Sequence, residues 1–201
     1  EPFAQQRLIA RAVLGVTEAC DPRGTPIDVG TPKQRALLAA LALQRGRPVS
    51  VGALEEILWG EEPPAAVAAS LQAYVSGLRK ALEPDRPPRT PARVVVTAVP
   101  GYALRIPADA LDAERFTTTV TDVHRGLAPD SGFDGSVLAP ADEGTLARHR
   151  AALEQVLALW RGEPLADLGD APAAVAERAR LDDLRLVALL DLASIRLAQG
   201  E

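Results

Sequence analysis

Residues 70–82 read SLQAYVSGLRKAL and residues 93–106 read RVVVTAVPGYALRI, and these two stretches decide the fold. In the first, four apolar residues recur at the i, i+4, i+7, i+11 spacing of a buried helical face, namely Leu71, Val75, Leu78 and Leu82. This spacing predicts a helix over roughly residues 65–82. In the second, two runs rich in β-branched residues meet at Pro100-Gly101, which predicts a β-hairpin.

Two strands are expected near the start of the chain. Residues 11–16 (RAVLGV) and 25–29 (TPIDV) are short, apolar and rich in β-branched side chains. The turn-forming sequence Asp21-Pro22-Arg23-Gly24 lies between them. We therefore expect the two stretches to pair as antiparallel strands.

Two helices are expected between these strands and residue 65. Thr31 can cap the first, with Pro32 at the first helical position and Gln34 where a capping-box partner belongs. Its apolar sequence continues to about residue 43 and stops before a glycine and a proline. A short extended piece over 48–51 and a second helix over 51–59 then follow.

The resulting order of strand, strand, helix, strand, helix, helix and hairpin is that of an OmpR-type winged helix-turn-helix. In that fold the third helix enters the DNA major groove, and the hairpin wing reaches the minor groove or the backbone. Four motifs occur in order: PKQRALLAALAL, VGALEEILWGEEPP, SLQAYVSGLRKAL and VPGYALRI. Together they resemble the Streptomyces antibiotic regulatory protein family, and the resemblance covers nearly all of residues 8–201. It implies an α+β winged-helix DNA-binding domain over 8–107 and an all-α, tetratricopeptide-like bacterial transcriptional activator domain over 108–201.

The second half is expected to be helical. Three helices are predicted, over 112–126, 145–160 and 173–199, the last as one long or two short helices. Asp112 can cap the first, and the second is expected to bury Leu146, Leu153, Val156, Leu157 and Trp160. Residues 127–144 lack an apolar period and are predicted as a surface loop. Because stacked helices need several neighbours, we expect more helices after residue 201.

The charge is distributed unevenly along the chain. The net charge is −5, but residues 1–107 carry 13 Lys and Arg against 10 Asp and Glu, whereas residues 108–201 carry 9 against 17. A weakly basic half beside an acidic half fits a DNA-reading domain joined to a protein-contacting domain. Ordinary surface charge is the alternative explanation.

The composition excludes several classes of function. The chain has the apolar and charged content of a globular protein, 47% and 24%, with no run of about 18 apolar residues and no leader peptide. We therefore expect a cytoplasmic protein that does not contact a membrane. Cys20 is the only cysteine, and His124 and His149 lack metal-ligand spacing. Since no nucleophile, base and orienting group can be assembled, we expect no enzyme, no catalytic or metal-binding residue and no cofactor.

Nine residues are candidate DNA contacts on the first helix, the third helix and the hairpin: Lys33, Ser70, Gln72, Tyr74, Ser76, Arg79, Lys80, Arg93 and Thr97. Arg79 and Lys80 directly follow the apolar stripe of the third helix, where the fold places phosphate-contacting side chains. The alternative is a solvated last turn whose cations interact favourably with the helix dipole. Gln72 and Ser76 are the polar groups best placed to read bases.

The chain departs from the family where the family carries arginines. Ala68 or Gly77 stands at one such position on the third helix, and Ala98 stands at another on the wing. The expected groove face, which includes Gly77, is therefore almost entirely Ala, Ser and Gly, with Lys80 its only cation. Alanine can touch a thymine methyl group but cannot make the bidentate contact to guanine.

Two functions remain open at this point. The resemblance implies a sequence-specific transcriptional activator of a bacterial antibiotic biosynthetic cluster. Its partners would be double-stranded promoter DNA with direct repeats, the sigma and alpha subunits of RNA polymerase, and a second copy in a homodimer. The alternative is a winged-helix and tetratricopeptide-like module that has lost DNA binding and binds a protein.

Overall fold

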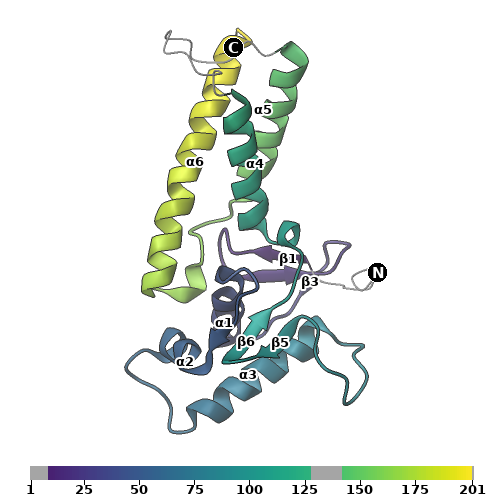
Figure 1. Cartoon of the computed structure of the whole chain (residues 1–201), viewed down its shortest axis with the longest axis vertical. Helices are drawn as coiled ribbons and strands as arrows, with labels where there is room; N and C mark the ends of the chain where they lie inside the picture. The colour runs from purple at the N-terminus through teal and green to yellow at the C-terminus, as the bar shows by residue number, and fades with distance from the viewer. Residues whose placement is uncertain (1–8, 128–141, 201) are drawn as a thin grey trace.

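The computed structural model describes residues 9–127 and 142–200, with the backbone alone for residues 9–12. Short strands and three helices form one part of the molecule, and three further helices rise from it as a second part (Figure 1). The expected order of a winged helix followed by an all-α domain is confirmed. None of the helices described is both long enough and apolar enough to cross a membrane.

The N-terminal sheet differs from the prediction. It has three antiparallel strands in the order β1 (Ile9–Ala12), β2 (Glu18–Cys20) and β3 (Pro26–Ile27). The predicted pairing of the outer two stretches was wrong, because each pairs with β2 between them. At three residues, β2 is too short to show a period-2 pattern, so only its pairing reveals it.

Helix α1 (Pro32–Leu43) is the central element of the winged-helix part. The predicted capping box is confirmed, because Thr31 Oγ1 accepts the Gln34 amide and Gln34 Oε1 accepts the Thr31 amide at 3.0 Å. From Ala36 to Ala42 every residue is buried, so the helix is surrounded on nearly all sides. It therefore serves as the support against which the other helices pack.

The remaining elements of the winged helix also match their predictions. Strand β4 (Val49–Ser50) leads into α2 (Val51–Trp59), which Ser50 caps, and α3 (Val67–Leu82) buries the predicted stripe of Leu71, Val75, Leu78 and Leu82. The hairpin consists of β5 (Val95–Ala98) and β6 (Gly101–Leu104), and the sheet order is β4-β6-β5.

Gly101 allows β4 and β6 to approach closely. A Cβ atom at this position would lie 2.0 Å from the Val49 carbonyl oxygen, closer than any real contact. Because that oxygen belongs to the backbone, it cannot rotate away. The glycine of the hairpin therefore also joins the wing to the rest of the domain.

The second part contains α4 (Asp112–Leu127), α5 (Glu143–Leu157) and α6 (Pro172–Ala198), and the last is a single helix of 27 residues. Two short 3-10 turns, η1 (Ala108–Ala110) and η2 (Ala166–Leu168), lie before α4 and α6. The three long helices pack against one another (Figure 1). Within the predicted loop, residues 128–141 lie outside the described residues.

The burial predicted for residues 145–160 holds only in part. Leu146, Leu153 and Val156 are buried, but Leu157 and Trp160 are half-buried, and α5 ends at Leu157, three residues before Trp160. The Trp160 ring packs edge-on against Phe116, with ring centroids 5.3 Å apart, and the Arg185 guanidinium lies over it. Trp160 therefore closes the side of the core instead of filling its centre.

Candidate nucleic-acid interface

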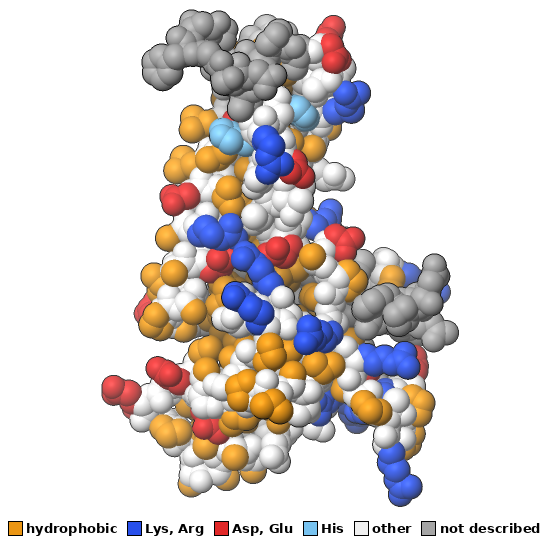
Figure 2. Space-filling model, in the orientation of Figure 1, with side chains coloured by type: hydrophobic (Ala, Val, Ile, Leu, Met, Phe, Trp, Pro, Cys, Tyr) orange, Lys and Arg blue, Asp and Glu red, His pale blue; other side chains and the backbone are white. Residues whose placement is uncertain are grey.

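Helix α3 runs along the lower surface of the molecule with one side open to solvent (Figure 1). Its exposed positions combine small and polar residues: Ala68, Ala69, Gln72, Ala73, Ser76 and Lys80. Figure 2 shows this surface as mostly uncharged, with acidic side chains toward one end and basic side chains toward the other. A helix of 16 residues is about 24 Å long and fits a B-DNA major groove.

Three of the predicted contacts form one exposed line on α3. Gln72, Ser76 and Lys80 are four residues apart, so they lie on one side of the helix, and all three are exposed. The line presents an amide, a hydroxyl and an ammonium group in sequence. These groups can read base edges and contact a phosphate.

Ser70 and Tyr74 lie farther from the open side. Both are half-buried, and the Tyr74 ring stacks on Trp59 of α2 with centroids 6.0 Å apart. The tyrosine therefore helps to hold α3 against α2. Its hydroxyl group is the part left for a ligand.

Arg79 turns toward the wing. Its Nε donates a hydrogen bond of 2.7 Å to the Val95 carbonyl oxygen, and its Nη2 donates one of 2.9 Å to Thr97 Oγ1. The guanidinium carbon lies 5.7 Å from the centre of the Tyr102 ring. Two predicted contacts, Arg79 and Thr97, are thus bonded to each other across the gap between α3 and β5.

Lys33 and Arg93 flank the helix and the wing. The Lys33 ammonium donates to the Leu58 carbonyl oxygen near the end of α2. Arg93 is exposed, while its backbone amide donates to the Glu83 carboxylate at 2.9 Å and so braces the chain between α3 and β5. Among the residues that the structure describes, the Lys80 and Arg93 side chains have no hydrogen-bond or ion-pair partner.

Gly77 does not lie on the open face where the sequence placed it. It is half-buried, and a Cβ atom there would come within 2.4 Å of Gln34 Nε2 on α1. The reason is the position of α1, which packs against α3 and places Gln34 beside this glycine. Ala98 is also half-buried, at the end of β5 opposite Gly101.

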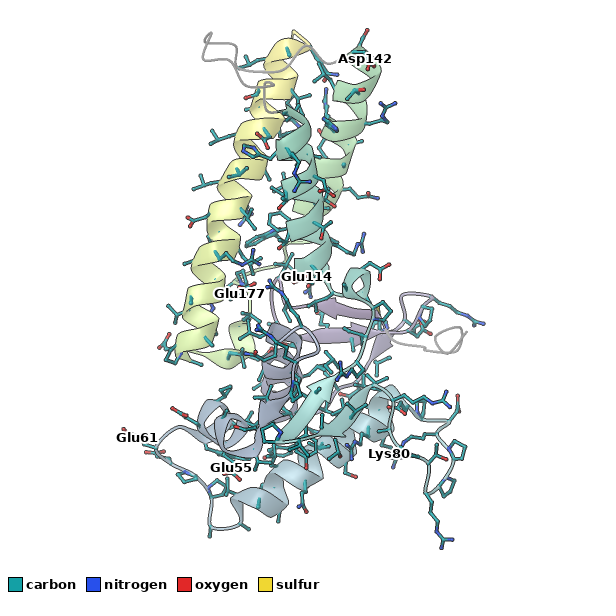
Figure 3. All side chains as sticks on the ribbon, viewed as in Figure 1. Glu55, Glu61, Lys80, Glu114, Asp142 and Glu177 are labelled. Atoms are coloured by element: carbon teal, nitrogen blue, oxygen red, sulfur yellow. The ribbon has the colours of Figure 1, made fainter. Side chains whose placement is uncertain are left out.

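Charge is polarised along this surface. Glu55 and Glu61 lie near the α2 side, whereas Lys80 lies at the other side of the winged helix (Figure 3). Glu56 and Glu62 add to the acidic end, and both are exposed. The end of α3 that carries Lys80 is therefore the end that attracts a phosphate backbone.

The sequence missed the polar residues that join the two parts of the molecule. Asp167 accepts from Arg35 Nε at 2.9 Å and from the Thr17 amide at 2.7 Å. Arg45 pairs with Glu114 of α4 and with Glu177 of α6, and Figure 3 shows these two glutamates near the junction of the two parts. These partners are up to 150 residues apart, so no local pattern could identify them.

Asp112 is the most deeply buried acid of the joint. It is 1% exposed and accepts hydrogen bonds from the Val13 and Leu14 amides at 3.0 and 3.2 Å and from Ala113 at 2.8 Å. The predicted capping role is not observed, because the Glu114 and Arg115 amides donate to the Leu111 carbonyl oxygen. The Asp112 carboxylate instead ties the start of α4 to the N-terminal part. Burial raises its pKa to about 6, against the opposing effect of these amides and of Arg161.

No group of three or more His, Cys, Asp or Glu side chains that could hold a metal ion occurs within residues 9–127 and 142–200. The two histidines lie on different helices. His124 on α4 pairs with Asp191 of α6 at 3.0 Å. His149 lies on α5 beside Gly126.

Two families match the chain. Residues 24–104 match the family described as "Transcriptional regulatory protein, C terminal". Residues 134–201 match the "Bacterial transcriptional activator domain". The first match contains α1, α2, α3 and the wing, and the second contains α5 and α6.

Several regulators are similar in sequence. The transcriptional regulatory protein EmbR of Mycobacterium tuberculosis (strain ATCC 25618 / H37Rv) is 40% identical over 148 residues, which are 73% of this chain and 34% of EmbR. Two proteins of Streptomyces coelicolor (strain ATCC BAA-471 / A3(2) / M145) also match. Regulatory protein AfsR is 36% identical over 88% of this chain and 16% of its own length, and transcriptional regulator RedD is 34% identical over 84% and 44%.

A solved structure is similar over nearly the whole chain. It is Mycobacterium tuberculosis EmbR in complex with a low-affinity phosphopeptide, with a TM-score of 0.78 and 34% identity. The match covers 98% of this chain and 47% of that one. The chain thus spans less than half the length of each of these relatives.

Proposed function

This chain belongs to the Streptomyces antibiotic regulatory protein family, and we propose on that basis that it is a sequence-specific DNA-binding transcriptional activator. Its targets are promoters of a bacterial secondary-metabolite, or antibiotic, biosynthetic cluster. The winged helix binds the promoter, and the helical domain contacts RNA polymerase. Both act in the cytoplasm.

The observation that carries the proposal is the joint presentation of α3 and the wing on one surface. Helix α3 buries one apolar side and leaves the line of Gln72, Ser76 and Lys80 in solvent. The wing projects beside it, and its tip residue Val99 is 93% exposed. A helix and a hairpin in this arrangement match the major and minor grooves of one duplex.

The exposed groups indicate what the protein reads. The Gln72 amide can bond an adenine in bidentate fashion, Ser76 can bond several bases, and the alanines can contact thymine methyl groups. Lys80 and Arg93 supply phosphate contacts. Since so few contacts give only modest affinity, binding as a homodimer to direct repeats supplies the rest of the binding free energy.

The family resemblance and the charge of the second half support the polymerase contact. Residues 108–201 carry 9 basic against 17 acidic residues, so this half is repelled by DNA and is suited to a protein partner. The sigma and alpha subunits of RNA polymerase are the partners that the family implies.

One observation favours the alternative, a protein-binding module without DNA affinity. The open side of α3 has Lys80 as its cation within the described residues, and Glu55, Glu56, Glu61 and Glu62 lie on α2 and the loop after it. Such a surface loses much of the nonspecific attraction to phosphates that supports DNA binding.

Selection of duplexes from a random-sequence library by the intact chain tests the proposal. We expect recovery of A·T-rich direct repeats about one helical turn apart. Fluorescence anisotropy on a recovered duplex at two salt concentrations should then give weaker binding for Gln72→Ala and a smaller salt slope for Lys80→Ala.

Arg125→Ala on α4 is the matched control, because it removes another exposed cation from the helical domain. We expect it to bind like the wild type. If the folded wild type shows no preference for any duplex even at low salt, the activator proposal fails and the protein-binding alternative takes its place.

A further inference from the structure

The side chain of Arg79 joins the recognition helix to the wing at several points. Its Nε bonds the Val95 carbonyl oxygen, its Nη2 bonds Thr97 Oγ1, and its guanidinium lies against the Tyr102 ring. Val95 and Thr97 belong to β5, and Tyr102 belongs to β6. One side chain of α3 therefore contacts both strands of the hairpin.

This contact falls on the weakly supported edge of the sheet. In the order β4-β6-β5, strand β5 has a neighbour on one side only. A hairpin of two four-residue strands has little stability of its own. Because the guanidinium is a rigid fork, bonds to two residues of β5 fix both the distance and the direction of that strand relative to α3.

The neighbouring cation has a different environment. Lys80 is exposed, and its ammonium has no hydrogen-bond or ion-pair partner among the described residues, whereas Arg79 is half-buried with two donors engaged. Arg79 and Lys80 are adjacent in the sequence, but their side chains point in different directions and therefore have different roles. Lys80 is available to a phosphate, and Arg79 is held by the wing.

We propose, on the basis of the proposed DNA-binding function, that Arg79 is a positioning residue that fixes the orientation of the wing relative to α3. It holds the hairpin so that the wing tip and α3 meet neighbouring grooves of one duplex together. Without it, DNA must order the wing during binding, which lowers affinity through conformational entropy. The guanidinium itself makes no phosphate contact.

The salt dependence of binding separates positioning from direct contact. On a duplex recovered by selection, Arg79→Ala should weaken binding about tenfold at every salt concentration without changing the salt slope. Lys80→Ala should lower the slope by about 0.9, as expected for one lost phosphate contact. Arg79→Lys should not restore affinity, because an ammonium cannot bond both Val95 and Thr97.

Shortened duplexes show whether the effect passes through the wing. The recovered duplex is cut back from either end, and the cut that removes the wing site is the one that weakens the wild type. On that shortened duplex Arg79→Ala and the wild type should bind equally. Thr97→Val tests the same contact, and the double variant should bind no worse than Arg79→Ala alone.

Two measurements on the free protein exclude a general loss of structure. Circular dichroism melting should show the Arg79→Ala variant folded at the assay temperature, and amide hydrogen exchange should rise selectively in β5 and β6. A smaller salt slope for Arg79→Ala that Arg79→Lys restores would overturn the proposal and assign a phosphate contact. Equal loss on full and shortened duplexes would overturn it too.

The outcomes also separate this proposal from the one on which it rests. If the wild type binds no recovered duplex, the DNA-binding function fails and the positioning role fails with it. If the wild type binds and Arg79→Ala binds equally well on the full duplex, only the positioning role fails.

Discussion

At the scale of single residues, polar side chains in this protein have more than one structural partner. Arg79 bonds two residues of the wing, and Asp167 bonds both α1 and the loop before β2. Gln34 completes a capping box and also lies against Gly77 of α3. Substituting such a residue disturbs two elements at once, so its effect exceeds that of one hydrogen bond.

Asp112 makes stability depend on pH. Its pKa of about 6 in the folded protein exceeds the usual value because burial disfavours the carboxylate. Protonated Asp112 therefore makes its full contribution to the free energy of unfolding below about pH 4. This contribution is lost as the pH rises through about 6, because the folded protein must then bury the carboxylate. The loss is about 3 kcal/mol.

Urea unfolding of the wild type and of Asp112→Asn between pH 4 and 7 measures this effect. The wild type should gain stability relative to the variant as the pH falls. Asp21, Asp142 and Glu154, whose pKa values are lowered by hydrogen bonds, occur in both proteins and cancel in the difference. A difference that stays constant over this range would contradict the assignment.

At the scale of elements, α3 has two sides with separate tasks. Leu71, Val75, Leu78 and Leu82 face the core, and the line of Gln72, Ser76 and Lys80 faces solvent. The wing stands beside the second side and is held against the rest of the domain by Gly101 and Arg79. Stability and recognition should therefore respond to different substitutions in the same helix.

Leu78→Ala should lower the free energy of unfolding by about 2–5 kcal/mol, because Leu78 is fully buried and leaves a cavity. Gln72→Ala should change it by about 0.5 kcal/mol or less while weakening DNA binding, because Gln72 is exposed. Chemical unfolding and anisotropy on the same preparations measure both effects. Equal destabilisation by the two substitutions would mean that the sides are misassigned.

At the scale of the whole molecule, the winged helix and the helical domain share one hydrophobic core. A continuous cluster of buried residues runs from Val13 to Ile195. Backbone bonds add to it, with Leu165 donating to Val13 at 2.6 Å and Arg161 donating to Leu14 at 2.8 Å. The orientation of the candidate DNA-binding surface is therefore tied to the helical domain.

The outer side of α6 is not part of this core. Leu186, Leu189, Leu190 and Leu197 are exposed there. Apolar helix faces of this kind are typical of stacked helical repeats, whose neighbours cover them. The expectation of further helices beyond residue 201 stays a prediction.

Because the core is shared, the intact chain should unfold in one cooperative transition. Isolated 1–107 and 108–201 should each melt at least about 5 °C lower, since a loss of about 1 kcal/mol has this effect in a domain of this size. Differential scanning calorimetry measures the transitions. Two transitions that persist unchanged after separation would show that the domains are independent.

A pair of acids provides the matched comparison for the joint. Asp167→Asn removes the negative charge paired with Arg35 and leaves one acceptor oxygen where Arg35 and the Thr17 amide use two, so it should lower the melting temperature of the intact chain. Asp170→Asn, three residues further on at an exposed position, should leave it unchanged. Equal effects would remove the special role assigned to Asp167.

Local features of this protein could be predicted from the sequence because their causes are local. The Thr31 capping box, the apolar stripe of α3 and the hairpin at Gly101 each depend on residues only a few positions apart. Periodicity and turn chemistry act over the same range. The order of these elements was sufficient to indicate the winged helix.

Other features were decided only by the tertiary structure. Strand β2 is defined by its two neighbours, Gly77 faces Gln34 because α1 packs against α3, and Arg79 points to the wing instead of away from the molecule. The bond between Arg35 and Asp167 spans 132 residues. In each case the partner of a residue depends on how distant elements pack, and no spacing along the chain carries that information.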